Sequence, residues 1–218
     1  MIYGYTKDRE LAWKIIEKLG LCNEQESKVQ FTMADRKINA VISTSVGRLF
    51  DAVSAILGIR RQSSFEGEAS MALEFAAEAY EQQNIMQGRD EKPDRLVYEK
   101  EERFILNTRM LVQQIVEEKM QGADSGRLAY LFHQVLAEQI TAACIEARSN
   151  SGRKKVALSG GVFQNRLLLR LTEEQLEQEG FEVLRHHMIP PNDGGIAIGQ
   201  AAYGMWRLNN HGLQDRRI

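Results

Sequence analysis

Residues 156–186 read VALSGGVFQNRLLLRLTEEQLEQEGFEVLRH, and this stretch determines the fold class. A short β run ends at Ser159, a helix is predicted over about 165–179, and a second β run occupies 181–186. A strand, a helix and a strand of this length predict a βαβ unit with parallel strands and a right-handed crossover. The chain then passes through PPNDGG into a last predicted helix, over 195–208. We therefore expect a helix-rich α/β fold with a small parallel sheet.

The rest of the chain is predicted to be largely helical. Apolar residues recur at helical spacing over 8–19, 24–36, 48–57, 66–83, 104–119 and 128–148. The run Ala40 to Ile42 is the exception, because it is short and β-branched. The charged stretch NIMQGRDEKPD contains a glycine and a proline and is predicted to be a surface connection. It suggests a division into a helical part (1–92), an α/β nucleotide-binding lobe (93–210) and a tail (211–218).

The overall composition is that of a globular chain with no excess of charge. It has 218 residues, 43% of them apolar, and its 28 basic residues nearly cancel the 30 acidic ones. A near-neutral chain offers no electrostatic basis for wrapping DNA or for binding an anionic membrane. Cys22 and Cys144 lie far apart and form no CxxC pair, which disfavours a disulfide framework or a cysteine zinc site. Because no apolar run approaches the roughly 20 residues that span a bilayer, we expect a cytoplasmic protein.

The first candidate ligand site is SGGVFQN, which spans residues 159–165. Gly160 and Gly161 would allow backbone N–H groups to approach a phosphate or a sugar without obstruction by a Cβ atom. Asn165 lies at the start of the following helix, where its amide could both donate and accept hydrogen bonds. A tight strand-to-helix turn without any ligand is the alternative interpretation.

The second candidate is PPNDGGIAIGQAAYG, which begins just beyond the second predicted strand. In a parallel sheet, both motifs would lie at the carboxyl ends of neighbouring strands, where such folds bind ligands. Asp193 has two interpretations. It caps the last helix by accepting a backbone hydrogen bond, or it is a ligand for a metal ion that bridges phosphates.

Two further motifs lie in the predicted helical part. In TSVGRLFDAVSAILG, Gly47 allows close backbone approach, and Asp51 is a carboxylate on an otherwise apolar helix. An ion pair between Arg48 and Asp51 is the alternative, and it would contribute only roughly 0.2–0.5 kcal/mol. In SSFEGEASMALE, Glu66 stands at a predicted helix start, where it would also interact favourably with the helix dipole.

These four motifs, in this order, resemble consecutive motifs of the HypF family of hydrogenase maturation carbamoyltransferases. The matching stretches are GRLFDAVSAILGI, FEGEASMALE, ALSGGVFQNRLL and IPPNDGGIAIGQA. The resemblance covers about Thr44 to Gly204 and is most specific from SGGVFQN onward, whereas residues before Asn39 match loosely. It implies a partial actin-like ATPase lobe of the ribonuclease H-like class, which the family shares with tRNA threonylcarbamoyltransferases and O-carbamoyltransferases.

The resemblance also implies a site and its ligands. An adenine nucleotide (ATP, AMP or carbamoyl-adenylate) would be surrounded by Gly47, Asp51, Glu66, Gly160, Gly161 and Asn165. Of these residues, Asn165 would contact the base or the ribose. In addition, Asp193 would be a ligand for a divalent metal ion. The implied reaction is carbamoyl transfer from carbamoyl-adenylate to the C-terminal cysteine of a HypE-like partner, which supplies the cyanide ligands of a nickel–iron hydrogenase.

The family's other metal ligands come from a paired-histidine motif in an earlier lobe, and this sequence does not contain that motif. Its four histidines are His133, His186, His187 and His211. We therefore interpret the chain as the C-terminal lobe of the transferase domain, either as a truncated gene product or as a fragment. Such a lobe would need the remainder of HypF and would catalyse little carbamoyl transfer alone. Two alternatives remain: a non-catalytic docking module of a split or truncated transferase, and a different actin-like carbamoyl or threonylcarbamoyl transferase.

Overall fold

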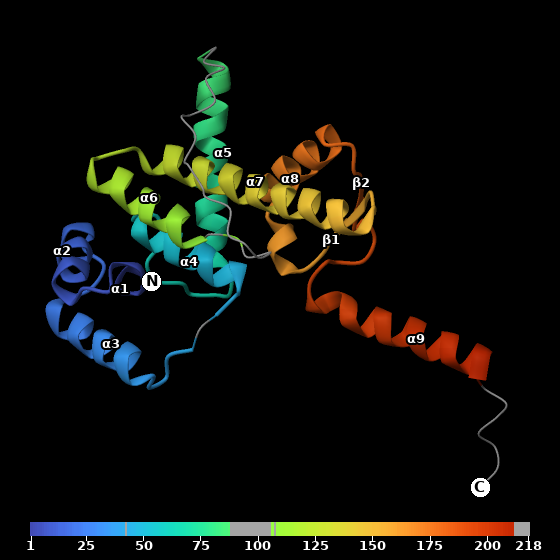
Figure 1. Cartoon of the computed structure of the whole chain (residues 1–218), viewed down its shortest axis with the longest axis horizontal. Coiled ribbons are helices and arrows are strands. Elements are labelled where there is room, and N and C mark those ends of the chain that lie inside the picture. Colours follow the sequence, from blue (N-terminus) through green and yellow to red (C-terminus); the bar gives the residue numbers. More distant parts are fainter. Residues whose placement is uncertain (42, 88–105, 107, 212–218) are drawn as a thin grey trace, which may run out of the picture.

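The computed structural model describes residues 1–41, 43–87, 106 and 108–211 (Figure 1). Most of these residues lie in helices. The helices are Ile2–Thr6 (α1), Arg9–Leu19 (α2), Glu24–Arg36 (α3), Val46–Ile56 (α4), Glu68–Met86 (α5), Thr108–Met120 (α6), Ser125–Ser151 (α7), Arg166–Gln178 (α8) and Ile196–His211 (α9). The strands are Lys155–Leu158 (β1) and Glu182–Arg185 (β2), and the 3-10 helices Gly161–Gln164 (η1) and Asp193–Gly195 (η2) precede α8 and α9. The predicted helix-rich α/β class is confirmed.

The predicted βαβ unit is also confirmed. β1 and β2 pair in parallel, with Leu158 opposite Arg185, and α8 forms the connection between them. Leu158, Leu176 and Phe181 are buried together in a small apolar cluster. Because parallel strands require a long crossover, the connecting helix is available to cover the sheet. The unit therefore has its own small core at one end of the molecule.

A second and larger core surrounds α7, the long helix in the middle of Figure 1. Its buried residues point to nearly all sides and include Leu128, Leu131, Phe132 and Leu136. This is expected of a helix that is enclosed by others. Helices α5, α6 and α8 all pack against it, and Phe50 of α4 meets Phe132 edge to face, with 4.9 Å between ring centroids.

Local signals set the helix ends, as the N-terminal part shows. Asp8 is the N-cap of α2, and its carboxylate accepts hydrogen bonds from the backbone N–H groups of Glu10 and Leu11. Gly20 ends the same helix in the left-handed region, at a φ of 61°, as predicted. Asn23 and Glu26 form a capping box at the start of α3. Such caps satisfy the backbone donors and acceptors that helix ends leave free.

The last helix, α9, extends away from the helical body (Figure 1). Several of its apolar side chains are exposed, namely those of Ile196, Ile198, Tyr203, Met205 and Leu208. Most helical stability in proteins comes from packing of an apolar face. Much of the apolar surface of α9 is therefore exposed to solvent in the part of the chain that the structure describes.

Several expectations about connecting segments come out differently. Ala40 and Val41 lie in no strand, and Val41 is 88% exposed. A lone β-branched run has no stability without a partner strand, and the described sheet contains only β1 and β2. Residues 84–86 continue α5 instead of starting a loop, because none of them breaks a helix. Ile42, the predicted boundary near residue 92 and the tail beyond His211 lie outside the described residues.

Length and apolar character together decide whether a helix could cross a bilayer. No helix among the described residues meets that requirement.

Candidate functional site

The two predicted ligand motifs meet at the carboxyl ends of β1 and β2. The backbone N–H of Gly160 donates a hydrogen bond of 2.9 Å to the carbonyl of Pro191, which joins the SGG turn to the PPNDGG turn. A Cβ atom placed on Gly161 would lie 3.9 Å from the Cβ of Asn192. The structure therefore brings these two motifs together, as the strand order predicted.

Gly160 gives the SGG turn its unusual backbone. Its φ of 101° and ψ of 159° lie in a region that L side chains rarely adopt, so glycine is needed here. The turn leads directly into η1, whose first two N–H groups belong to Gly161 and Val162. Neither N–H takes part in a hydrogen bond within the part of the chain that the structure describes. Two backbone donors are thus available beside the carboxyl end of β1.

A serine and a histidine are paired at the same edge of the sheet. Ser159 follows β1, His186 follows β2, and the Ser159 Oγ lies 2.9 Å from the His186 Nε2. Both residues are exposed. Sequence reasoning gave neither residue a role, although each directly follows a strand of the predicted parallel pair. The strand register that aligns Leu158 with Arg185 also brings these two side chains together.

Asn165 is the N-cap of α8, and its amide makes two internal hydrogen bonds. Its Oδ1 accepts from the backbone N–H of Leu168 at 2.8 Å, and its Nδ2 lies 3.0 Å from the Nε2 of His133. His133 is fully buried on α7, and its Nδ1 lies 2.7 Å from the carbonyl of Ala129. Burial lowers the pKa of His133 to about 4, so the ring is neutral at physiological pH.

Glu74 of α5 completes the capping of α8. Its carboxylate accepts hydrogen bonds from the backbone N–H groups of Arg166 at 2.6 Å and Leu167 at 3.4 Å. Glu74 is buried, and this desolvation raises the pKa of its carboxyl group, whereas the two backbone hydrogen bonds lower it. Sequence reasoning missed this residue, because its partners are more than ninety positions away. The available signal was an acidic residue on the apolar face of a predicted helix.

The start of α8 is therefore occupied by the protein's own side chains. Its first three N–H groups bond to Glu74 and Asn165, and a buried carboxylate already interacts with the positive end of the helix dipole. The sequence predicted that the glycines of the SGG turn, one turn earlier, would let backbone N–H groups approach a phosphate. The donors without a hydrogen bond to another described residue lie at that turn, at the beginning of η1.

Asp193 is exposed at the start of η2. The capping role belongs to its neighbour Asn192, whose side chain accepts a hydrogen bond of 3.1 Å from the N–H of Gly194. The Asp193 carboxylate has no hydrogen bond or ion pair with any other described residue. Within those residues there is also no group of three or more His, Cys, Asp or Glu side chains that could enclose a metal ion.

Gly47 and Asp51 lie on α4, which packs against η1. Gly47 is exposed in the first turn of the helix. Asp51 lies 3.6 Å from Arg48, so the ion pair considered from the sequence is present. Its Oδ1 also accepts a hydrogen bond of 3.3 Å from the Ser70 hydroxyl of α5. The packing of α4 against η1 places this helix next to the SGG turn, while the contacts of Asp51 itself are to α4 and α5.

Glu66 is exposed just before α5, and Gly67 is the N-cap of that helix, with a φ of 84°. The acidic group that organises this turn is Glu68. Its carboxylate pairs with Arg60 and accepts hydrogen bonds from the backbone and hydroxyl of Ser64. The role predicted for Glu66 in contacting a nucleotide stays a prediction.

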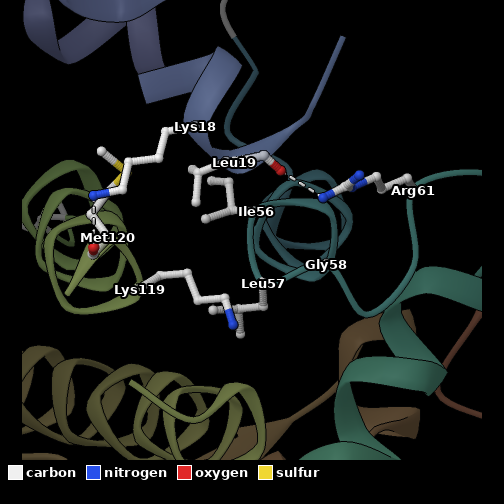
Figure 2. A pocket seen from close by; sticks show the side chains of 8 residues that line it. All are labelled: Lys18, Leu19, Ile56, Leu57, Gly58, Arg61, Lys119 and Met120. Atoms are coloured by element: carbon white, nitrogen blue, oxygen red, sulfur yellow. Dashed lines mark hydrogen bonds between the residues drawn. The ribbon is translucent and has the colours of Figure 1, made fainter. Parts of the chain in front are cut away.

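A cavity of about 170 Å³ lies elsewhere, where the C-terminal ends of α2, α4 and α6 meet (Figure 2). Basic side chains donate directly to the ends of α6 and α2, and a serine that contacts a lysine donates to the end of α4. The Lys18 Nζ donates to the carbonyl of Met120 at 3.0 Å, and the Arg61 guanidinium donates to the carbonyl of Leu19 at 2.6 Å. The Lys119 Nζ lies 2.6 Å from the Ser125 hydroxyl, which itself donates to the carbonyl of Leu57 at 2.9 Å.

Such cations offset the partial negative charge at helix C-termini. We therefore interpret this cavity as a structural junction and not as a ligand site.

The junction leads to a prediction for Arg61→Met. This change is expected to lower the free energy of unfolding by about 0.5–1.5 kcal/mol, because the carbonyl of Leu19 loses its donor. Urea denaturation would measure the difference. The matched control is Arg48→Met, whose exposed pair with Asp51 is expected to contribute about 0–1 kcal/mol. A smaller effect at Arg61 than at Arg48 would contradict the structural interpretation.

Similar proteins point to one family. Residues 1–200 match the family described as "Carbamoyltransferase, Kae1-like Domain, second subdomain". The chain is 35% identical over 162 residues to the carbamoyltransferase HypF of Synechocystis, which covers 74% of this chain and 19% of that protein. It is 28% identical over 196 residues to the probable carbamoyltransferase HypF of Methanocaldococcus jannaschii, which covers 90% of this chain and 24% of that protein.

A crystal structure of full-length HypF in the phosphate- and nucleotide-bound form has the same fold. It superposes with a TM-score of 0.76 and 34% identity, over 90% of this chain and 25% of that one. The chain thus spans about a quarter or less of the length of these relatives. It belongs to the HypF carbamoyltransferase family, in which it corresponds to the second subdomain of the Kae1-like domain.

Proposed function

We propose that this chain forms one side of a carbamoyltransferase active site that binds an adenine nucleotide and carbamoyl-adenylate. The carbamoyl group passes to the C-terminal cysteine of a HypE-like partner during maturation of a nickel–iron hydrogenase. In this transfer the carbamoyl carbon forms a bond to the thiolate sulfur, its bond to the adenylate phosphate oxygen breaks, and AMP leaves.

The joined glycine turns at the carboxyl ends of β1 and β2 carry this proposal. The hydrogen bond from Gly160 to Pro191 holds the two turns together. Beside it stand the N–H groups of Gly161 and Val162, which make no hydrogen bond to another described residue, and the Ser159 hydroxyl, which is paired with His186. Backbone N–H groups in a glycine turn are suited to hold a phosphate, because they donate without a side chain in the way. The phosphate of the nucleotide is therefore assigned to this edge of the sheet.

Asp193 fits a divalent metal ion as one ligand of a set that is completed outside this chain. Its carboxylate is exposed beside the same edge, and carboxylate oxygens are ligands that Mg²⁺ prefers. A metal ion held there would neutralise charge on the phosphate as AMP leaves. The described residues of this chain would thus orient the phosphate and supply one carboxylate ligand.

Calorimetric titration with AMP and with ATP plus Mg²⁺ tests the proposal. We expect heat of binding and a higher melting temperature, since a ligand at a hundredfold its dissociation constant adds about 2.7 kcal/mol of stability. Asp193→Asn is expected to remove the dependence of binding on Mg²⁺ while leaving AMP binding measurable. No calorimetric signal and no melting shift at millimolar nucleotide would contradict the proposal.

Gly160→Ala provides the sharper arm of the same experiment. An alanine is disfavoured at a φ of 101°, so the SGG turn must change its shape and binding is expected to weaken by about tenfold or more. The matched control is Gly152→Ala, which also has a positive φ, of 70°, and open space around it, but lies at the end of α7. If both variants weakened binding equally, general strain and not the turn would be the cause.

A second candidate function, docking, is favoured by α9. We infer that its exposed apolar side chains pack against the remainder of a HypF protein, because the chain covers only about a quarter of its relatives. Met205→Lys and Leu208→Lys are each expected to abolish capture of that remainder in a pull-down. The control is Val29→Lys, which changes an exposed apolar residue on α3. Capture that survives both α9 variants would contradict this assignment.

A further inference from the structure

The hydrogen bonds around His133 leave only one arrangement of its protons. A carbonyl oxygen can only accept, so the Nδ1 of His133 must carry the proton that is shared with Ala129, 2.7 Å away. Because burial keeps the ring neutral, with a pKa of about 4, the Nε2 has no proton. That nitrogen is therefore an acceptor, and it faces the side-chain amide of Asn165.

The amide of Asn165 is consequently fixed in orientation as well. Its Nδ2 donates to the Nε2 of His133 at 3.0 Å, and its Oδ1 accepts from the N–H of Leu168 at 2.8 Å. Rotation of the amide by half a turn would place Oδ1 against an unprotonated nitrogen and Nδ2 against an N–H. Both hydrogen bonds would be lost in a partly buried environment, where unmade bonds cost about 1–3 kcal/mol each.

One donor and one acceptor of this amide remain for a ligand. An asparagine side chain offers two N–H donors and two lone pairs, and the internal bonds of Asn165 use one of each. The residue is half-buried and stands directly after η1, next to the free N–H groups that the proposed phosphate site uses. A donor and an acceptor in fixed order form a recognition element for the edge of a purine base.

We propose that His133 is a positioning residue that makes the nucleotide site select a 6-aminopurine over a 6-oxopurine, through its hold on Asn165. This inference rests on the proposed function, and of the two contacts that the resemblance implies for Asn165, to the base or to the ribose, it takes the one to the base. On the N7 side, adenine presents an acceptor and a donor, whereas guanine presents two acceptors. On the N1 side, the order of donor and acceptor is reversed between the two bases. On the N1 side, an amide that cannot rotate therefore distinguishes the two bases, whereas one that rotates freely adapts to either.

Paired titrations with AMP and GMP test this inference on the 218-residue chain. The wild-type protein is expected to prefer AMP by about tenfold or more, the discrimination typical of one bidentate contact to a base. His133→Leu removes the acceptor and is expected to bring the two affinities within about threefold of each other. His133→Gln is expected to restore the preference, since its carbonyl can accept from Asn165 while its NH2 group faces Ala129.

Leu111→Ala separates lost selectivity from lost stability. Leu111 is buried on α6, and its truncation is expected to destabilise the chain while leaving the AMP preference intact. If the wild type binds neither nucleotide, the proposed function and this inference fail together. If it binds AMP with a preference that His133→Leu leaves unchanged, this inference alone is overturned.

A measurement on the wild type requires no variant to fold. Nitrogen-15 NMR is expected to show the Nδ1–H tautomer of His133 between pH 5 and pH 8, and AMP is expected to shift the side-chain NH2 signals of Asn165. A protonated Nε2, or signals of Asn165 that AMP and GMP shift equally, would overturn the inference.

Discussion

Phe50→Ala is expected to lower the free energy of unfolding by about 3–5 kcal/mol, the usual cost of truncating a buried aromatic side chain. Phe50 is fully buried and packs edge to face on both Phe132, at 4.9 Å, and His133, at 5.2 Å between ring centroids. Its removal leaves a cavity between α4 and α7, beside the residue that holds Asn165. Because single domains are stable by only about 5–15 kcal/mol, this variant is expected to melt far below the wild type.

Phe75→Ala is the matched control for that variant. The side chain of Phe75, on α5, is 58% exposed, so its truncation is expected to change stability by about 0.5 kcal/mol or less. Chemical denaturation followed by circular dichroism would measure both differences. Equal losses at the two positions would mean that the core between α4 and α7 is not packed as the structure shows.

Glu74→Ala is expected to cost about 1–3 kcal/mol, because two backbone donors at the start of α8 lose their acceptor. The N–H of Leu167 is buried, so water does not readily replace the carboxylate there. The variant also leaves the positive end of the α8 dipole without its counter-charge. Denaturant titration at neutral pH would measure the loss, and Glu78→Ala, on the same helix and less buried, is the control.

Glu74→Gln tests the electrostatic part of this role through pH. Burial raises the native-state pKa of Glu74 above its ordinary value of 4.5, so the native protein binds this proton more tightly than the unfolded chain. The proton-linked part of the contribution of Glu74 is therefore fully present below pH 4.5 and is lost as pH rises through the raised pKa, whereas the hydrogen bonds to Arg166 and Leu167 remain at neutral pH. The glutamine variant keeps an acceptor oxygen but does not titrate, so its free energy of unfolding is not expected to fall over this pH range. If the free energy of unfolding changed with pH equally in the wild type and in the variant, the assignment would be contradicted.

Much of the fold could be predicted from local pattern. The helix over Glu24–Arg36, the C-cap at Gly20 and the parallel βαβ unit all agree with their sequence predictions. Each depends on interactions within a few residues or on a crossover whose geometry has few solutions. The short β-branched run that begins at Ala40 forms no strand at Ala40 or Val41, because a strand depends on a partner strand, and a local sequence pattern does not show whether one is present.

The candidate site was only partly predictable for the same reason. The spacing of SGG and PPNDGG was enough to place both turns at one edge of the sheet, and the bond from Gly160 to Pro191 agrees with it. The pairing of Ser159 with His186 required the register of β1 and β2. The roles of Glu74 and His133 depend on how α5 and α7 pack on α8, which residue type and spacing do not reveal.

Sequence by itself determined the family, the helix-rich α/β class and the four motifs, because these depend on residue identity and on short-range periodicity. Tertiary structure decided which donors and acceptors remain for a ligand. It assigned the start of α8 to Glu74 and Asn165, and it left the N–H groups of Gly161 and Val162 and the exposed carboxylate of Asp193 available. The physical reason is that each hydrogen-bonding group has few bonds to make, and only the packed chain shows which of them are already made.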